Sequence, residues 1–473
     1  MPKPLVPVCE CFKEDIGSGS SGITPGLCYN IRLRRPSTRQ IQHIGPPLDA
    51  LESGLDGDNL SVLRFLRDRA LSQSFPIYVV GGPVRDVLMG LPIKDLDFVV
   101  EGNGPELAQW LASQVGGEVR VHPRFGTSTL VLGRCRVDVV TARRETYPKP
   151  AALPQVTSGT ISDDLARRDF SINALALPLA EERPEIMDPH GGIDDLRRRV
   201  IRILHPNSFV DDPTRIFRAV RYEQRLGFVL EPGTLDCLNS ALAQGHLAAL
   251  TGDRLRHELE KILDEDHPQR ALERSAALGI LAEVHPALGR EEALGRLMAL
   301  SSEGADTGKD GPNDAGPLTY VAALAYPLSE IQAEELIRRI NAPGAWARVI
   351  RDVVSLKDRE DALAGDGLSP SQWTEAVDGR CAEAVLAVAR LTQFPLVSER
   401  LDLYSEQLLY IGPALTGKDL LDMGVPQGPG LGRLLRQLRE AKLDGAVSTE
   451  DDERRWVREH MDDSTRANPT PLA

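Results

Sequence analysis

The chain has 473 residues and a mass of 51.7 kDa, which is more than one hydrophobic core normally organises, so we expect two to four domains. Apolar residues make up 41% and charged residues 26% of it, as in globular proteins, and the absence of any run of about 18 apolar residues excludes a membrane-spanning helix. Six scattered cysteines exclude a disulfide framework, and the N-terminus lacks the pattern of a secretory signal, so the sequence predicts a cytoplasmic protein.

The net charge of −14 argues against nucleic acid as a partner. Phosphate charge is felt only within about 8 Å at physiological salt, however, so the local distribution of charge matters more than the sum. Residues 197–225 hold eight arginines and three acidic residues. Taken alone, such a segment is more often a solvated, ion-paired helix face than an RNA site, and both interpretations stay open.

The predicted elements begin after a leader at residues 1–45. This segment contains DIGSGSSGITPG, has no sustained hydrophobic periodicity and is predicted to be flexible. Its Cys9 and Cys11 fit free thiols better than a metal site, because no second close pair of ligands accompanies them.

Residues 46–180 alternate short apolar runs with helical patterns. We predict a small mixed sheet with flanking helices, built from strands at 76–82, 96–102, 127–133 and 135–142 and a helix at 106–116. After residue 181 strand signals nearly vanish and apolar residues recur at helical spacing, so the remainder is predicted to be mostly α-helical, with an exposed loop at the polar stretch 301–317. The fold class is therefore α+β.

Two aspartates, Asp95 and Asp97, stand one residue apart beside the second predicted strand. In a strand this spacing points both carboxylates to one face, where they repel each other unless a cation lies between them. Oxygen ligands of this kind favour magnesium. Asp138 lies inside another apolar strand, where an unpaired acid would be costly. If the two strands are neighbours, Asp138 adds a third carboxylate to the same metal ions.

Gly81 and Gly82 end the first predicted strand and open a helix. Such a turn leaves backbone N–H groups and a helix N-terminus available for phosphate oxygens, and Arg85 can add a bidentate phosphate contact. Metal ions, a triphosphate and a nearby hydroxyl define a phosphoryl or nucleotidyl transfer site. Each piece alone also fits a structural role, such as a tight turn, a strand end at the surface or an ion pair within one helical turn. GGPVRD lacks the GxGxxG spacing of a dinucleotide-binding turn.

GGPVRDVLMG followed by KDLDFVV resembles the signature of the class II tRNA nucleotidyltransferase and bacterial poly(A) polymerase family, in the DNA polymerase β superfamily. Four further motifs similar to those of the family follow in its order, at 163–177, 188–202, 211–228 and 252–263. The resemblance covers about 76–265 strongly, and 415–445 more weakly resembles the tail of some members. It implies three parts after the leader: a nucleotidyltransferase head at 46–180, a helical neck with the nucleotide-selecting motif at 181–265, and a helical body and tail that bind tRNA at 266–473.

The resemblance also assigns roles. It implies that Asp95 and Asp97 are the metal-binding pair, that Asp138 is the third catalytic carboxylate, and that the cofactor is Mg²⁺. The remaining matches concern the nucleotide: the triphosphate-binding turn is Gly81, Gly82 and Arg85, the contacts to phosphates and ribose are Arg168 and Asp169, and a supporting contact is Asn173.

Asp212 and Arg215 match the family's pair that reads the incoming base. The chemistry agrees: a carboxylate accepts from the amino group of A or C, arginine donates to their ring acceptors, and G and U present the opposite polarity. Three residues apart, the two would share one helix face and hold one base edge, whereas the alternative is an ordinary surface ion pair. The family usually has glutamate where this chain has Asp211, which we expect to brace the helix start as a capping residue.

These motifs predict a template-independent enzyme that adds CMP and AMP from CTP and ATP to the 3′ end of tRNA and releases pyrophosphate. The alternatives are a poly(A) polymerase, a tRNA enzyme that adds only A or only CC, and, in a different class, a non-catalytic RNA-binding protein. The polar linker 143–165 has the size of the family's flexible loop, which CC-only enzymes characteristically lack. No HD dipeptide signals a phosphohydrolase domain, and neither a membrane nor a stable protein partner is implied. The helical remainder is expected to bind tRNA by shape and phosphate contacts.

Overall fold

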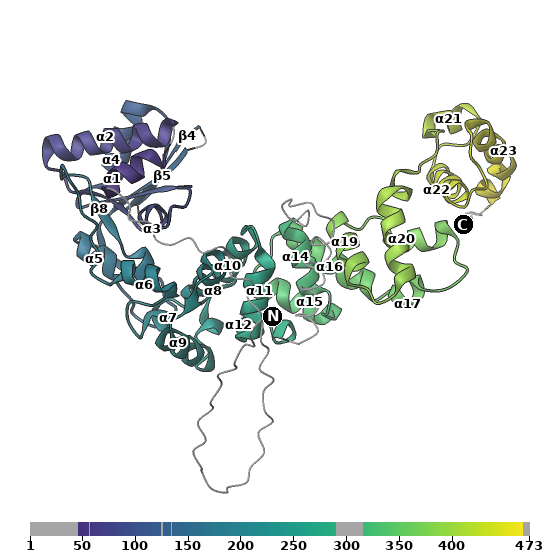
Figure 1. Cartoon of the computed structure of the whole chain (residues 1–473). Coiled ribbons are helices and arrows are strands. Elements are labelled where there is room, and N and C mark those ends of the chain that lie inside the picture. The colour runs from purple at the N-terminus through teal and green to yellow at the C-terminus, as the bar shows by residue number, and fades with distance from the viewer. Residues whose placement is uncertain (1–45, 56, 124–125, 134, 290–315, 467–473) are drawn as a thin grey trace, which may run out of the picture. The chain divides into compact units, whose positions relative to one another are not determined.

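The computed structural model describes residues 46–55, 57–123, 126–133, 135–289 and 316–466 (Figure 1). The predicted leader with Cys9 and Cys11 lies outside the described residues, as does most of the predicted loop 301–317. Among the described helices, none combines the length and the apolar character that crossing a membrane requires.

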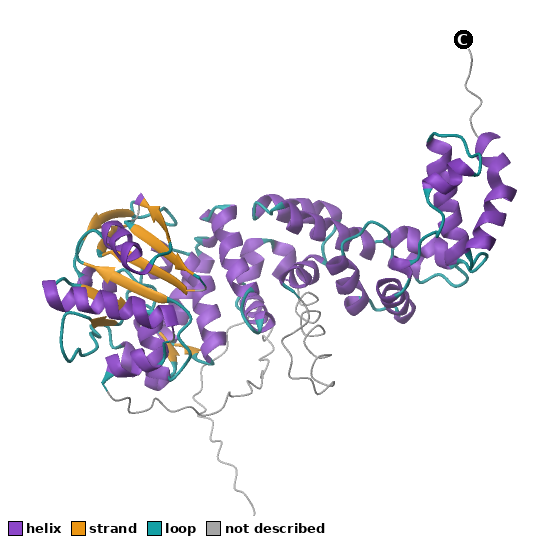
Figure 2. Ribbon diagram, turned by 90° about the horizontal axis from the view of Figure 1, so that it is seen from above, coloured by secondary structure: helices purple, strands orange, loops and turns teal. Residues whose placement is uncertain are grey.

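A six-stranded mixed sheet forms the core of the N-terminal part, as predicted (Figure 2). Its strand order is β3-β4-β5-β2-β1-β8, in which β5 and β2 run parallel and the other neighbours run antiparallel. The bounds are β1 Ile77–Val80, β2 Leu96–Val100, β3 Glu118–His122, β4 Thr127–Leu132, β5 Cys135–Thr141 and β8 Ala176–Pro178. Of these, β3 and β8 were not predicted.

The two faces of the sheet follow from the alternation along β2. Leu96, Phe98 and Val100 are buried in the main apolar core with helices α2 and α4, whereas Val99 belongs to a smaller cluster on the opposite side. Asp97 alternates with the first set and therefore shares the face of Val99. The helices that accompany the sheet are α1 Pro47–Ser53, α2 Gly57–Gln73, α3 Gly82–Met89, α4 Gly104–Val115 and α5 Ile161–Ala166.

The linker 143–165 is more structured than predicted. Its two ends pair as an antiparallel hairpin, β6 Arg143–Thr146 with β7 Gln155–Ser158, and α5 follows. The base of the hairpin is fixed by Glu145, whose carboxylate pairs with Arg143 and Arg167 and accepts a hydrogen bond from the Tyr147 hydroxyl. Burial, and then the charge of Glu145, raises the pKa of Tyr147, so this hydroxyl stays protonated and donates.

The described residues after the sheet are mostly helical, as predicted, and also form a two-stranded parallel pair of β9 Val200–Ile201 and β10 Val229–Leu230. The helices after the sheet, in chain order, are α6 Gly192–Arg198, α7 Ser208–Asp211, α8 Thr214–Leu226, α9 Pro232–Ala243, α10 Gly252–Leu263, α11 Pro268–Ala277, α12 Ile280–Val284, α14 Pro317–Ala325, α15 Glu330–Arg339, α16 Gly344–Lys357, α17 Glu360–Leu363, α18 Pro370–Val377, α19 Ala382–Leu391, α20 Pro395–Glu406, α21 Gly417–Asp422, α22 Pro429–Leu443 and α23 Glu450–Arg466. Short 3-10 turns lie at Ser171–Asn173, Leu247–Ala249, Pro286–Gly289 and Leu408–Tyr410.

Candidate active site

Two of the predicted acidic residues lie side by side in the sheet. Asp97 of β2 and Asp138 of β5 are direct partners in the parallel register. Register partners in neighbouring strands point to the same face, and both residues line one cavity of about 1210 Å³, together with Asp95. The structure thus brings the three carboxylates to one cavity. Asp97 and Asp138, 41 residues apart in sequence, come from two neighbouring strands, and Asp95 directly precedes β2.

The carboxyl group of Asp97 lies in surroundings that disfavour its charged form. Burial raises the pKa of Asp97, Arg168 lowers it, and the neighbouring charges of Asp138 and Asp95 raise it again, to about 6. Like charges this close disfavour full ionisation without a positive partner, and carboxylate oxygens suit Mg²⁺. The donor set therefore fits a divalent ion at Asp95 and Asp97.

Asp138 has other partners in the structure. Its Oδ1 accepts a hydrogen bond from the Thr129 hydroxyl at 2.5 Å, and its Oδ2 lies 3.5 Å from Arg136. Within the described parts of the chain, no three Asp, Glu, His or Cys side chains are already gathered around one point as a metal cage. The ligand role of Asp138 accordingly stays a prediction.

The glycine turn lies where it was predicted, but one of its amides is occupied. Gly81 directly follows β1, at φ +71°, and its N–H donates to the carbonyl of Leu175 at 2.9 Å. Contrary to the prediction, this amide is therefore not available to phosphate. A Cβ on Gly81 would lie 2.6 Å from Nη1 of Arg168. The positive φ favours glycine at this position, and a Cβ would displace the guanidinium of Arg168. Gly82 begins α3 and lines the cavity.

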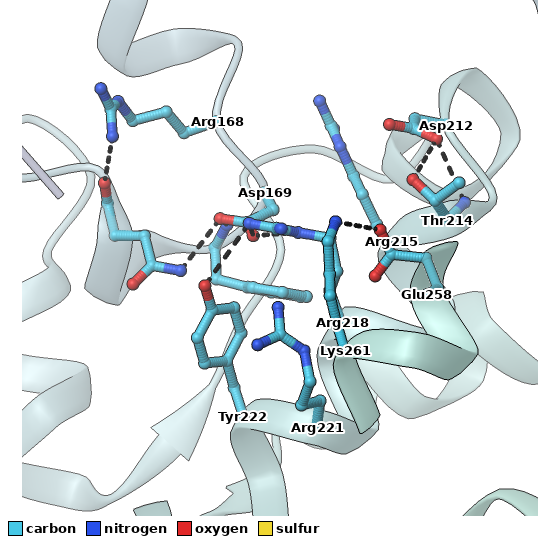
Figure 3. Close-up of polar contacts among 12 residues, drawn as sticks. Arg168, Asp169, Asp212, Thr214, Arg215, Arg218, Arg221, Tyr222, Glu258 and Lys261 are labelled. Atoms are coloured by element: carbon cyan, nitrogen blue, oxygen red, sulfur yellow. Dashed lines mark hydrogen bonds and ion pairs between the residues drawn. The ribbon is translucent and has the colours of Figure 1, made fainter. Parts of the chain in front are cut away.

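Arg85 is buried and bonded to other side chains, whereas a side chain free to contact phosphate was predicted. It is 4% exposed, donates from Nη1 to Oδ1 of Asn173 at 2.6 Å and pairs with Asp86. The amide of Asn173 in turn donates to Oδ1 of Asp169 at 3.1 Å, and Oδ2 of Asp169 accepts from Nε of Arg218 at 2.8 Å. Figure 3 shows Asp169 beside Arg218 and Tyr222. The predicted residues Arg85, Asn173 and Asp169 thus form one hydrogen-bonded chain along the cavity.

Asp169 is strongly ionised despite its burial. Burial raises the pKa of the carboxyl, but Arg218 and the hydrogen bond from Asn173 lower it more, to about 2. Arg168, the preceding residue, pairs with the buried Asp164 at 3.0 Å and donates to the carbonyl of Asn173. These contacts hold Arg168 above the glycine turn.

Asp212 and Arg215 both line the cavity, but the geometry differs from the prediction. Asp212 lies in the extended junction between α7 and α8, at φ −134° and ψ 92°, and not on a helix face shared with Arg215. The physical reason is Pro213, because the residue before a proline is pushed out of the helical region. Arg215, in the first turn of α8, is 5% exposed and donates to the Ser208 hydroxyl and to the carbonyl of Arg167, each at 2.7 Å.

The expected capping role of Asp211 is also wrong. Asp211 is the last residue of α7. The first turn of α8 is capped by its neighbour Asp212, whose Oδ1 accepts from the N–H and the hydroxyl of Thr214.

In the arginine-rich segment 197–225, the arginines of the second half line the cavity. Arg215, Arg218, Arg221 and Arg225 of α8 all line it, and three of them, together with Arg85, surround the ring of Tyr222 at 5.0 to 5.6 Å. Arg218 and Arg254 were not predicted from the sequence. Arg218 stands three residues after Arg215, and this helical spacing was the available signal.

The motif predicted at residues 188–202 has a structural role. Both carboxylate oxygens of Asp188 accept backbone N–H groups at the start of α6, from Gly192 and Ile193. A Cβ on Gly192 would lie 2.2 Å from the carbonyl oxygen of Ser171, so only glycine fits. This contact fixes the segment that carries Asp169 and Asn173.

Comparisons with known proteins show the family to which the chain is similar. Residues 77–202 match the family model described as the poly A polymerase head domain, and residues 227–291 match one described as the probable RNA and SrmB-binding site of polymerase A. A solved structure of the Thermotoga maritima CCA-adding enzyme complexed with tRNA is similar at a TM-score of 0.69 and 29% identity, covering 88% of this chain and 99% of that one.

Two curated relatives are similar over most of the chain. An A-adding tRNA nucleotidyltransferase of Geobacter sulfurreducens is 35% identical over 90% of the chain, which spans 49% of that relative's length. A CC-adding tRNA nucleotidyltransferase of Deinococcus radiodurans is also 35% identical, over 82% of the chain and 90% of the relative. The chain therefore belongs to the class II tRNA nucleotidyltransferase family.

Proposed function

We propose that this protein adds CMP and AMP to the 3′ end of tRNA without a nucleic-acid template. The observation that carries the proposal is the register of Asp97 with Asp138 at the floor of a cavity that also contains Arg168, Asp212 and Arg215. Carboxylates at one place and arginines at another suit a divalent ion, a triphosphate and a base in a single site.

In the proposed reaction, the 3′ hydroxyl of the RNA attacks the α-phosphorus of the nucleotide. A new O–P bond forms, the bond to the β-phosphate oxygen breaks, and pyrophosphate leaves. Mg²⁺ bound at Asp95 and Asp97 would lower the pKa of the hydroxyl and neutralise charge on the triphosphate. Asp138, at the same face of the sheet, receives the proton of the hydroxyl directly or through water.

Nucleotide selection is assigned to Asp212 and Arg215. Asp212 accepts from the amino group of adenine or cytosine, and Arg215 donates to their ring acceptors. Arg168 and Asp169 hold the phosphates and the ribose, and both are already fixed by ion pairs, so little ordering is required when the nucleotide binds.

Addition of A alone is the second candidate, because the Geobacter relative that is similar over 90% of the chain is an A-adding enzyme. The deciding experiment supplies purified protein with tRNA ending before the first C, after one C and after CC, giving each nucleotide separately with Mg²⁺. Extension of all three substrates supports CCA addition, extension of the CC-ended tRNA by a single A supports the second candidate, and a long A tail indicates a poly(A) polymerase.

The carboxylate assignment has its own test. The double variant Asp95→Ala with Asp97→Ala is expected to lose incorporation while tRNA binding is retained, because the phosphate contacts of the helical part are untouched. Glu118→Gln, at an exposed side chain of the edge strand β3, is the matched control and is expected to behave as the wild type. Near-normal incorporation by the double variant would remove both residues from the reaction.

The base-reading assignment is tested by discrimination. Arg215→Ala is expected to relax selection against GTP and UTP by about tenfold, since a lost hydrogen bond to a charged group is worth about 1.5 kcal/mol or more. Arg198→Ala, at an exposed arginine of the same basic segment, is the control. Unchanged selectivity in Arg215→Ala would exclude that residue from base reading.

A further inference from the structure

Arg254 of α10 joins three segments that are distant in sequence. Its Nη2 donates to Oδ1 of Asp212 at 2.6 Å, and its Nη1 donates to the carbonyl oxygen of Ala151 at 2.7 Å. Ala151 lies between β6 and β7, at the tip of the hairpin, and its own N–H donates to the carbonyl of Val210. One guanidinium thus connects the hairpin tip, the junction between α7 and α8, and α10.

The contacts of Asp212 are all on one side of its carboxylate. The N–H and hydroxyl of Thr214 and the guanidinium of Arg254 converge on Oδ1. Among the described residues, no hydrogen bond to Oδ2 is seen. A carboxylate held by three donors at one oxygen presents the other oxygen in a fixed direction.

We propose that Arg254 is a positioning residue for nucleotide selection: it orients Asp212 so that Oδ2 meets the amino group of the incoming base. The inference rests on the proposed function of Asp212. A guanidinium suits this task because its planar fork donates in two fixed directions, here one to Asp212 and one to the hairpin. Lysine would keep the charge but lose the fixed angle between the two contacts.

The same link ties the hairpin to the selecting residue. Tyr147, Leu153 and Pro154, which lie on both sides of Ala151, line the cavity that Asp212 also lines. The position of this wall and the direction of Asp212 are therefore set by one side chain. The two side chains of this ion pair are only 22% and 23% exposed, so a role in stability alone is the competing explanation, and it predicts lowered thermal stability with unchanged discrimination.

The test compares Arg254→Met and Arg254→Lys with Arg256→Met as the matched control. Arg256 lies in the same helix and also forms ion pairs, with Asp253 and Glu260, but does not line the cavity. We expect both Arg254 variants to lose discrimination for ATP and CTP over GTP and UTP by about tenfold, with thermal unfolding close to that of the wild type. The control is expected to keep wild-type discrimination.

Two measurements make the outcome specific. Equilibrium binding of the four nucleotides reports selection without turnover, and a double-variant cycle with Asp212→Asn tests whether Arg254 acts through Asp212. In Asp212→Asn, adding Arg254→Met is expected to cause less than a twofold further loss of discrimination. A full additional tenfold loss, or unchanged discrimination in Arg254→Met, overturns the inference. If the wild type neither binds nor incorporates A and C preferentially, the proposed function fails as well.

Discussion

Arg218→Met leaves the buried carboxylate of Asp169 without its cation, and its consequences can be worked out from the structure. Asp169 is 7% exposed and accepts two hydrogen bonds from the guanidinium of Arg218, at 2.8 and 2.5 Å. In the variant, the side chain amide of Asn173 and the N–H of Phe170 remain as donors to Asp169. A neutral side chain of similar length preserves the packing, so the change isolates the charge.

The expected size follows from two estimates. Removing one partner of a buried pair costs about 3–5 kcal/mol. Independently, the pKa of Asp169 is about 2, and an unfolded aspartate titrates near about 3.9, so the native contacts of the charged form contribute about 2–3 kcal/mol at neutral pH. Because the native pKa is the lower one, this contribution is present above about pH 4 and is lost as the pH falls towards about 2.

Urea titrations at pH 7, 5.5 and 4, followed by hydrogen exchange of the segment 170–173, measure the free energy of opening this region. Arg218→Met is expected to lower it by about 3 kcal/mol at pH 7, and the deficit should shrink towards pH 4, because an unpaired buried carboxyl takes up a proton more readily. Adding Asp169→Asn should recover part of the loss. A deficit that is constant across this range, or no recovery in the double variant, would refute the charge argument. Arg225→Met, which removes a more exposed partner of Glu265 in the same helix, is the control.

Two glycines give further predictions. Gly81→Ala and Gly90→Ala both place alanine at positive φ, at a cost of about 1–2 kcal/mol, but only a Cβ at Gly81 meets Arg168, whereas Gly90 faces open space. Binding of ATP, measured by calorimetry, should therefore weaken about tenfold only in Gly81→Ala, and equal affinities in the two variants would contradict the proposed contact. Gly192→Ala forces a Cβ against the carbonyl of Ser171 and should destabilise the protein by about 3 kcal/mol in urea titrations; wild-type stability would mean that the turn relaxes freely.

The central part of the site was predictable because it depends on local pattern. The alternation of apolar and acidic residues around Asp97 and Asp138 specifies which face each carboxylate takes, once the strands are recognised. Their adjacency required only that two buried strands be neighbours. The sheet then placed the pair in direct register.

Other features were missed although a signal existed. Asp212 and Arg215 have helical spacing, but Pro213 stands between them, and its effect on the preceding residue outweighs the spacing. The β6–β7 hairpin was missed because its strands hold mostly polar residues, so they lack the alternation of apolar and polar residues that identifies a half-buried strand.

The ion pairs of Arg218 and Arg254 could not be predicted from the sequence. The partners of Arg218 and Arg254 lie 49 and 42 residues away, and an arginine on a helix has many acidic residues within reach of a folded chain. Only the three-dimensional path of the helices selects Asp169 for one and Asp212 for the other. Contacts of this kind depend on tertiary packing, which no local periodicity encodes.

The strands that carry Asp97 and Asp138 are both interior strands of the sheet, with β4 on one side and β1 on the other. Slippage of either strand by one position would break hydrogen bonds along both of its edges and turn its acid into the apolar layer beneath. The spacing between the two carboxylates is thus set by the backbone, and it does not depend on long side chains finding each other. Substitutions in the edge strands of the sheet, β3 and β8, can therefore occur without altering the distance between Asp97 and Asp138 on which catalysis would depend.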